Sequence, residues 1–272
     1  MTLTPLIDAQ EIYCLERYTS LDYFAELRAA WEMLVKHVEM SLDSFMQKLP
    51  ADYRLRKLPE QPDIVWGELV LPNFRDTLQG LTTGLTLLSH GDFKGFLWAS
   101  GPLGDFRGQL EYWSGWMTES ERTEYNRLLH HCVTLSSNIS TTAGARWLPT
   151  ELSTRFAAKE RGMFALPTQW PAYEVRQGIF VASGCKVTKG GIYVPDLDSA
   201  NTEFLSPELN EAPMAKILVE VRELFAPDSG KKYDEEVVIR EEPCVWYLVE
   251  RIAGTAQGSI AQPVANVKLN RI

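Results

Sequence analysis

The chain has 272 residues, of which 45% are apolar, and it carries a formal net charge of −9. This length and composition predict one large domain or two modest ones around a well-formed core, and they exclude an intrinsically disordered chain. The acidic balance argues against direct nucleic-acid binding and favours a basic partner, because no basic stripe exists to neutralise phosphates. No run of about 20 apolar residues and no signal-like amino terminus is present, so we expect a cytoplasmic protein without membrane association.

A first long helix is predicted to begin at Thr19-Ser20 and to end near Leu49-Pro50. The side chain of a Ser or Thr at this position can accept hydrogen bonds from the free N–H groups of a first helical turn, and Asp22 complements the positive helix start. Apolar residues then recur at helical spacing from Leu21 to Phe45, which predicts one buried face.

The longest apolar-periodic stretch runs from Pro62 to Trp116 and predicts two helices in antiparallel contact. His90-Gly91-Asp92 separates them, because glycine can adopt the left-handed conformation that ends a helix and Asp92 can cap the next one. Thr118 and Glu121 match a capping box, so a further helix is predicted from there to about Ala143-Gly144.

The chain changes character near Gly162. The part before it predicts a bundle of four principal helices with short pieces, the last of them over Thr150–Phe156. After it, glycines and prolines punctuate short runs rich in Val, Ile, Tyr and Phe, a pattern typical of strands and turns. The segment Ala215–Phe225 is compatible with a helix. The strand candidates are Gly178–Ala182, Gly191–Pro195, Val237–Arg240 and Cys244–Glu250.

The predicted fold class is therefore α+β, an N-terminal multi-helix bundle followed by a smaller β-rich C-terminal unit. We place the helical domain at residues 1–162 and the β-rich domain at residues 163–272. Trp116 and Trp170 are candidates for exposure. Five other tryptophans fall in or beside apolar stripes and are predicted to be core residues: Trp31, Trp66, Trp98, Trp113 and Trp147.

Known motifs for catalysis, metal binding and nucleotide binding are absent from the sequence. His130 and His131 are adjacent on a predicted helix and point about 100° apart, so they cannot chelate one metal as histidines at i and i+4 do. Ser183-Gly184-Cys185 lacks the GxSxG context of a nucleophile. No GxxxxGK[ST] loop and no GxGxxG after a strand is found. We therefore predict a protein that is not an enzyme, with no catalytic residue, no metal and no cofactor.

Acidic residues gather in two stretches of the predicted β-rich part. The stretch from Asp196 to Glu211 holds five acids and no Lys or Arg, and the stretch 234–242 is relieved only by Arg240. Solvated loops are one explanation; the functional alternative is an acidic face that docks a cationic cleft, where opposite potentials speed encounter and fix orientation. The candidate docking residues are Asp196, Asp198, Glu203, Glu208 and Glu211, followed by Asp234, Glu235 and Glu236.

Several blocks of the sequence resemble known families. Asp63-Ile-Val-Trp66-Gly67-Glu68-Leu-Val-Leu-Pro72-Asn73, Leu88-Ser89-His90-Gly91-Asp92, and Asn138-Ile139 before Trp147 are similar to the helical immunity proteins of bacterial polymorphic toxin systems, within them to immunity protein family seventy-one. Gly184-Cys185, Gly191-Ile192-Tyr193-Val194-Pro195, Ala212-Pro213 and Trp246 resemble the companion family seventy-two, although Lys186 stands where that pattern has a proline. The resemblance carries over no catalytic residue.

The resemblance implies an immunity protein that binds and neutralises a cognate toxin, with a nuclease effector of a type VI secretion system as the expected partner. A nuclease needs a basic cleft for its substrate, which fits an acidic antidote. Two other classes stay open. One is an adaptor or chaperone that carries an effector to its secretion machine, and the other is an enzyme whose motifs are unrecognised; a pocket with convergent polar groups would favour the latter.

Overall fold

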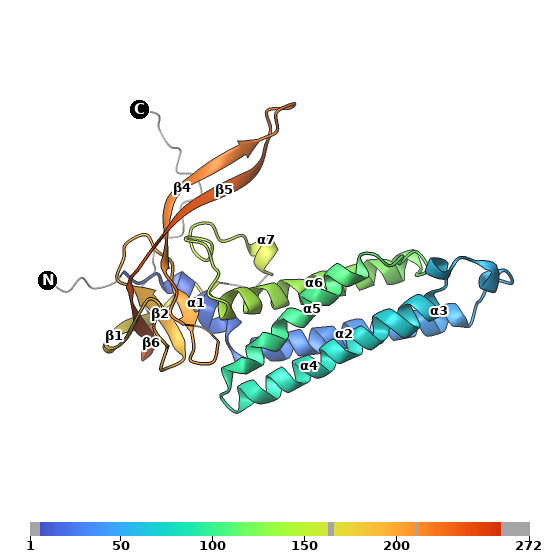
Figure 1. Cartoon of the computed structure of the whole chain (residues 1–272), viewed down its shortest axis with the longest axis horizontal. Coiled ribbons are helices and arrows are strands. Elements are labelled where there is room, and N and C mark those ends of the chain that lie inside the picture. The colour runs from blue at the N-terminus through green and yellow to red at the C-terminus, as the bar shows by residue number, and fades with distance from the viewer. Residues whose placement is uncertain (1–5, 163–165, 210, 257–272) are drawn as a thin grey trace. The chain divides into compact units, whose positions relative to one another are not determined.

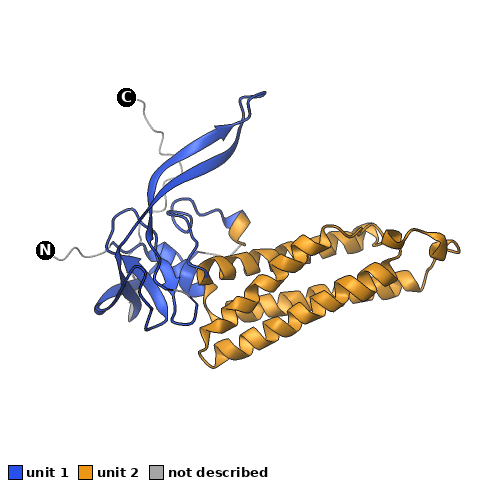
Figure 2. Ribbon diagram, in the orientation of Figure 1, with its two compact units in different colours: residues 1–17, 144–159, 163–272 blue, residues 18–143, 160–162 orange. Residues whose placement is uncertain are grey.

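The computed structural model describes residues 6–162, 166–209 and 211–256 and has an α+β fold (Figure 1). The described residues divide into two compact units (Figure 2). We call the described parts of 18–143 and 160–162 the helical unit, and those of 1–17, 144–159 and 163–272 the sheet unit. None of the helices in the described ranges combines the length and apolar character that crossing a bilayer requires.

Four α-helices run through the helical unit: α2 (Leu21–Met46), α4 (Leu71–Ser89), α5 (Gly101–Gln109) and α6 (Glu119–Ala143). The shorter segments are the 3₁₀ helices η1 (Tyr53–Leu55), η2 (Leu58–Glu60) and η4 (Phe93–Ser100), the single turn α3 (Pro62–Ile64) and the π-helical η3 (Val65–Val70). The two remaining helices are α1 (Ala9–Tyr18) and α7 (Ala158–Arg161). The largest buried side chains of the helical unit include Phe24, Trp31, Trp66, Phe74, Phe96 and Tyr125.

Local capping rules set the helix starts as the sequence predicts. The Ser20 side chain accepts a hydrogen bond from the Tyr23 N–H at the start of α2. Thr118 and Glu121 form the reciprocal pair of a capping box, in which each backbone N–H donates to the other residue's side chain, at 2.8 and 3.3 Å. These bonds satisfy N–H groups that a helix start otherwise leaves without a partner.

The predicted break after α4 is confirmed, whereas the element that follows it differs from the prediction. Gly91 has a φ of +78°, and the Asp92 side chain accepts from the Lys94 N–H. The chain then forms two pieces, η4 and α5, instead of one α-helix. A Cβ on Gly84 would lie 2.7 Å from the carbonyl oxygen of Gly95, so α4 and η4 pack backbone to backbone. That close approach depends on a glycine in each segment.

The sheet unit contains a four-stranded sheet in the order β1-β6-β2-β3 and a separate two-stranded sheet, β4-β5. The strands are β1 (Pro171–Ala182), β2 (Gly191–Pro195), β3 (Glu203–Leu205), β4 (Ala215–Phe225), β5 (Lys232–Glu242) and β6 (Val245–Ala256). All recorded pairs are antiparallel, with Val181 opposite Trp246 and Val194 opposite Tyr247. Tyr193, Leu205 and Trp246 are fully buried in the core of the sheet unit.

Ala215–Phe225 is a strand, so the helical interpretation that its sequence left open is wrong. The segment pairs along its length with β5, from Ala215 opposite Glu242 to Phe225 opposite Lys232. The connecting turn is closed by hydrogen bonds from the Ala226 N–H to the Lys231 carbonyl and from the Gly230 N–H to the Ala226 carbonyl. Pairing with a second β-branched run decides the structure of a sequence whose local preference is ambiguous.

The two units are each discontinuous in sequence, whereas the change in composition near Gly162 predicts a single boundary after residue 162. Residues 9–17 and 144–159 belong to the sheet unit, because side chains such as Glu11 and Ala145 contact its core or its loops. The short piece predicted over Thr150–Phe156 is a series of turns, and Thr150 has a φ of +67°. Contacts between residues this far apart in sequence leave no local periodic signal.

The tryptophan predictions are only partly correct. Trp31, Trp66 and Trp147 are buried, but Trp98 and Trp113 are 47% and 46% exposed, and Trp116, expected at the surface, is buried. A Cβ on Gly80 would lie 2.6 Å from the Trp98 ring, so the indole packs directly against the backbone of α4 at this glycine. It therefore makes an apolar contact while much of it stays in solvent.

Candidate protein-docking surface

The sheet unit carries a long hairpin, β4-β5, which we call the arm (Ala215–Glu242). In Figure 2 the arm extends away from the four-stranded sheet as a two-stranded ribbon. Within the described residues, its recorded backbone link to the loop before β3 is a bridge between Ala200 and Ile217, supported by a bond from the Leu218 N–H to the Ser199 carbonyl. An isolated hairpin is marginal in water, so the base of the arm needs further support.

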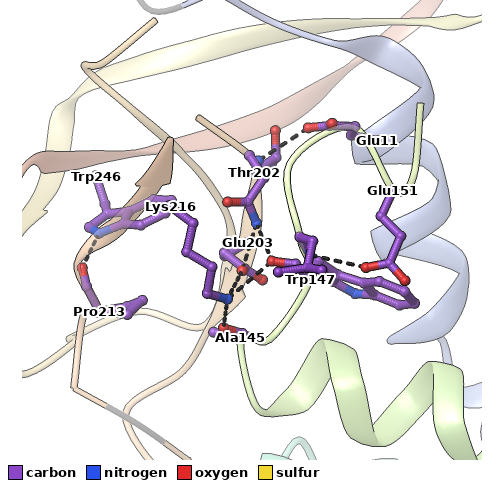
Figure 3. A network of polar contacts seen from close by, with 11 residues as sticks. Glu11, Ala145, Trp147, Glu151, Thr202, Glu203, Pro213, Lys216 and Trp246 are labelled. Atoms are coloured by element: carbon purple, nitrogen blue, oxygen red, sulfur yellow. Dashed lines mark hydrogen bonds and ion pairs between the residues drawn. The ribbon is translucent and has the colours of Figure 1, made fainter. Parts of the chain in front are cut away.

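Buried polar side chains provide that support at the base (Figure 3). The Lys216 ammonium, at the start of β4, donates to the carbonyl oxygens of Ala145 and Trp147 at 2.8 and 3.0 Å, and it lies 3.3 Å from Glu203 Oε1. Asn201 Nδ2 donates to the same Glu203 oxygen at 2.7 Å. These contacts join the arm to β3 and to the segment that follows α6, and so fix where the arm leaves the sheet unit.

Glu203 is the most constrained acid of this network. Its side chain is almost completely buried, and burial raises the pKa of the carboxyl to about 7 despite the opposing effects of Lys216 and Asn201. Among the described residues, Glu203 Oε2 has no hydrogen-bond partner. A carboxyl in this position holds a proton near neutral pH much more readily than an exposed one. The network therefore supplies structural specificity, and its charge is not offered to a partner.

A second buried carboxylate, Glu11 on α1, holds the neighbouring loop. Glu11 Oε2 accepts from the Thr202 N–H at 3.1 Å, and Glu11 Oε1 accepts from the Ser153 hydroxyl at 3.0 Å. Burial is the largest cause of the raised pKa of Glu11, and Asp8 adds to it. The segment just before β3 is thus tied to α1 and to the turns of 144–159.

Burial removes Glu203 from the predicted docking set, because it is 1% exposed and bonded inside the protein. Asp196 is half-buried, and its Oδ1 accepts from the Val245 N–H at 2.9 Å, which makes it a local cap between β2 and β6. The remaining acids of this stretch, Asp198, Glu208 and Glu211, are exposed. Glu203 is buried against Lys216, which follows it by thirteen residues and lies in another strand. A contact of this kind leaves no local signal in the sequence.

The three predicted acids of β5 differ in the charge they can offer. Glu235 lies 2.5 Å from Lys232 and 3.6 Å from Arg155, and its hydrogen bond with Lys232 lowers its pKa. Glu236 faces Arg222 at 3.6 Å. Asp234 is exposed, and no basic side chain of the described residues forms a recorded ion pair with it. Asp234 therefore offers the least compensated charge of the three.

The arm contains more acids than the three predicted docking residues Asp234, Glu235 and Glu236. It has eight acidic and five basic residues, and the acids outside the predicted set include Glu220 and Glu223 on β4. The acids of β4 lie outside the stretch 234–242 that the sequence singles out, in a segment whose secondary structure the sequence left open. Within the described ranges, no three His, Cys, Asp or Glu side chains gather as a metal site would require.

The residues that carry the family resemblance have structural roles. Trp66 lies in the π-helical segment η3 and is fully buried, and its indole N–H donates to the Trp113 carbonyl at 3.0 Å. Asn138 is buried and donates to the Tyr23 hydroxyl at 2.9 Å. The Trp147 carbonyl accepts from Lys216. Such residues maintain the fold, so they do not by themselves locate a binding surface.

No family model, curated protein or solved structure matches this chain. The resemblance to immunity protein families seventy-one and seventy-two consequently rests on the residue blocks given above.

Proposed function

We propose that this protein is an immunity protein that binds and neutralises a cognate secreted antibacterial toxin by non-covalent association. The toxin is a basic nuclease effector of a type VI secretion system. The observation that carries the proposal is a projecting, net-acidic arm whose neighbouring loops expose further acids, Asp198 before β3 and Glu208 and Glu211 after it.

The charge arrangement supports recognition of a basic protein. A nuclease cleft is positive because it neutralises phosphates, and a surface of opposite sign raises the rate of encounter and excludes partners of like charge. The acids Asp198, Glu208 and Glu211 of these loops are exposed, so their charges face solvent. An antidote needs a fast association rate because free toxin damages the cell from the moment it arrives.

The stable base of the arm supports the same function. Lys216, Glu203 and Asn201 hold the start of β4 through bonds of 2.7 to 3.3 Å, so the direction of the arm is set before a partner binds. Preorganisation of this kind reduces the conformational entropy that binding must overcome. A standard interface of roughly 1,600 Å² would extend over the arm and its acidic surroundings.

The test is protection of a susceptible bacterium that expresses the toxin encoded beside this gene. The wild-type protein is expected to restore growth and intact DNA, and the triple charge reversal Asp198→Lys/Glu208→Lys/Asp234→Lys is expected to lose protection. A matched control reverses three exposed acids of the helical unit, Asp43, Glu60 and Glu111, and should protect normally. The proposal is wrong if the wild-type protein does not protect, or if it is needed only for export of the effector.

A further inference from the structure

The distal half of the arm, Val219–Val238, exposes large apolar side chains in an otherwise charged ribbon. Val219, Val221, Phe225 and Tyr233 are 54%, 38%, 51% and 66% exposed. Scattered apolar residues are common on protein surfaces. Here, however, four of them lie within one short hairpin segment that has no other strand beside it in the described structure.

Two register shifts in the pairing of β4 with β5 determine the positions of Val219 and Tyr233. Leu218 pairs with Ile239 and Glu220 with Val238, so Val219 is an extra residue on β4. Leu224 pairs with Asp234 and Phe225 with Lys232, so Tyr233 is an extra residue on β5. A bulge interrupts the ladder and re-aims the side chain of the extra residue. Both bulges of the arm therefore present a large apolar group to solvent, one on each strand.

The surroundings of these groups are acidic. Glu220, Glu223 and Asp234 are exposed beside them, and the arm as a whole has three more acids than bases. This composition disfavours a second copy of the arm as the occupant, because two acidic ribbons repel each other. It favours a basic surface with an apolar groove, which would bury the apolar groups and neutralise the acids together.

We propose that the distal half of the arm inserts into an apolar groove bordered by Lys and Arg side chains on the toxin, with Phe225 and Tyr233 as the anchors. This inference rests on the proposed function and adds a division of labour within the site. Aromatic anchors in a desolvated centre control the lifetime of a complex, whereas the surrounding charges control its rate of formation. The acids steer the toxin to the arm, and the two aromatic rings hold it.

The experiment measures binding kinetics on an immobilised toxin, the product of the adjacent gene with its catalytic residue substituted. Phe225→Ala and Tyr233→Ala should each raise the dissociation rate constant about thirty-fold or more and leave the association rate constant within about threefold. Glu220→Lys/Asp234→Lys should lower the association rate constant about tenfold or more, with a small effect on dissociation. Met40→Ala, a change at an exposed apolar residue of α2, is the matched control and should change neither constant.

Hydrogen exchange provides a second measurement on the same proteins. Amides of residues 219–233 should exchange faster than those near Ile217 in the free protein and gain protection when toxin is added. Wild-type dissociation in both alanine variants, while the parent binds tightly, would overturn the anchor assignment and leave the proposed function intact. Failure of the parent to bind the toxin would overturn both. A parent dimer that Phe225→Ala converts to a monomer in sedimentation would identify a second copy as the occupant and overturn the toxin groove.

Discussion

The base and the distal half of the arm differ in how their charges are used. At the base, Lys216 and Glu203 face each other in the protein interior, and their polar atoms bond to neighbouring loops. In the distal half, acids such as Asp234 lie in solvent next to exposed aromatic rings. A charge that has been buried and paired determines structure, and one that stays exposed is available for recognition. Only the second kind can make a docking surface.

The largest expected effect comes from breaking the base. Lys216→Met should destabilise the sheet unit by about 3 kcal/mol, because it leaves Glu203 buried without its cationic partner. We expect the lower end of the range for such changes, since Glu203 can then take up a proton. Lys231→Met, at the exposed turn of the arm, is the control and should scarcely change the free energy of unfolding. Denaturant unfolding monitored through the indole N–H of Trp246, which donates to Pro213 at the base of the arm, measures both. Equal effects of the two substitutions would refute the distinction between base and turn.

A pH dependence of stability should appear at the base of the arm. The pKa of Glu203 is raised to about 7 by burial, above its value in the unfolded chain, so the folded protein binds more protons between about pH 4.5 and 7. The free energy of unfolding of the sheet unit should therefore fall as the pH rises through that range, by a few kcal/mol at most. Glu203→Gln should make the profile shallower, because glutamine does not titrate, and should leave the smaller slope that the raised pKa of Glu11 contributes. The same slope in wild type and variant would show that another group titrates.

Substitutions of the aromatic residues in the distal half of the arm should weaken toxin binding without lowering the stability of the free protein. Phe225→Ala and Tyr233→Ala remove exposed side chains. The free energy of thermal unfolding should therefore stay within about 0.5 kcal/mol of the wild-type value, as for most surface substitutions. The same variants are expected to shorten the lifetime of the toxin complex. Calorimetry of the free proteins and the binding kinetics described above test the two halves of this prediction. A large loss of stability would place these rings in the core of the arm instead of at its contact surface.

The smallest expected effect concerns a charge that an ion pair now compensates. Lys232 contacts Glu223 and Glu235 at 2.9 and 2.5 Å. Lys232→Ala would free Glu223 and leave Glu235 with Arg155 alone, so association with a basic toxin should accelerate about two- to threefold at low ionic strength, with little change in the free energy of unfolding. Stopped-flow association kinetics can resolve this change. Slower association would mean that Lys232 itself contacts the toxin.

Local rules explain how much of the fold could be predicted. Ser20, Asp92 and the Thr118–Glu121 pair cap helices through bonds within a few residues, and these positions were predictable. The α+β class followed in the same way from periodicity and from turn residues. The discontinuous units could not be predicted, because Glu11 bonds to Thr202 and Lys216 bonds to Ala145 and Trp147. Such contacts depend on chain segments that meet only in the folded protein.

The candidate site was predictable in composition but not in detail. The acid-rich stretches around residues 196–211 and 234–242 were visible in the sequence, and several of their acids are exposed. Glu203 was indistinguishable from its neighbours, because its burial depends on Lys216, thirteen residues later in another strand. The apolar anchors were hidden for a related reason. The bulges at Val219 and Tyr233 exist only in the paired register of β4 and β5.

The most direct test of the central claim is the ionic-strength dependence of the association rate constant between this protein and the inactivated toxin. Exposed acids that steer a basic partner predict a steep fall in the rate constant between about 50 and 500 mM salt, and a nearly flat line for Asp198→Lys/Glu208→Lys/Asp234→Lys. A rate constant that does not depend on salt for the wild-type protein would contradict recognition through an acidic surface.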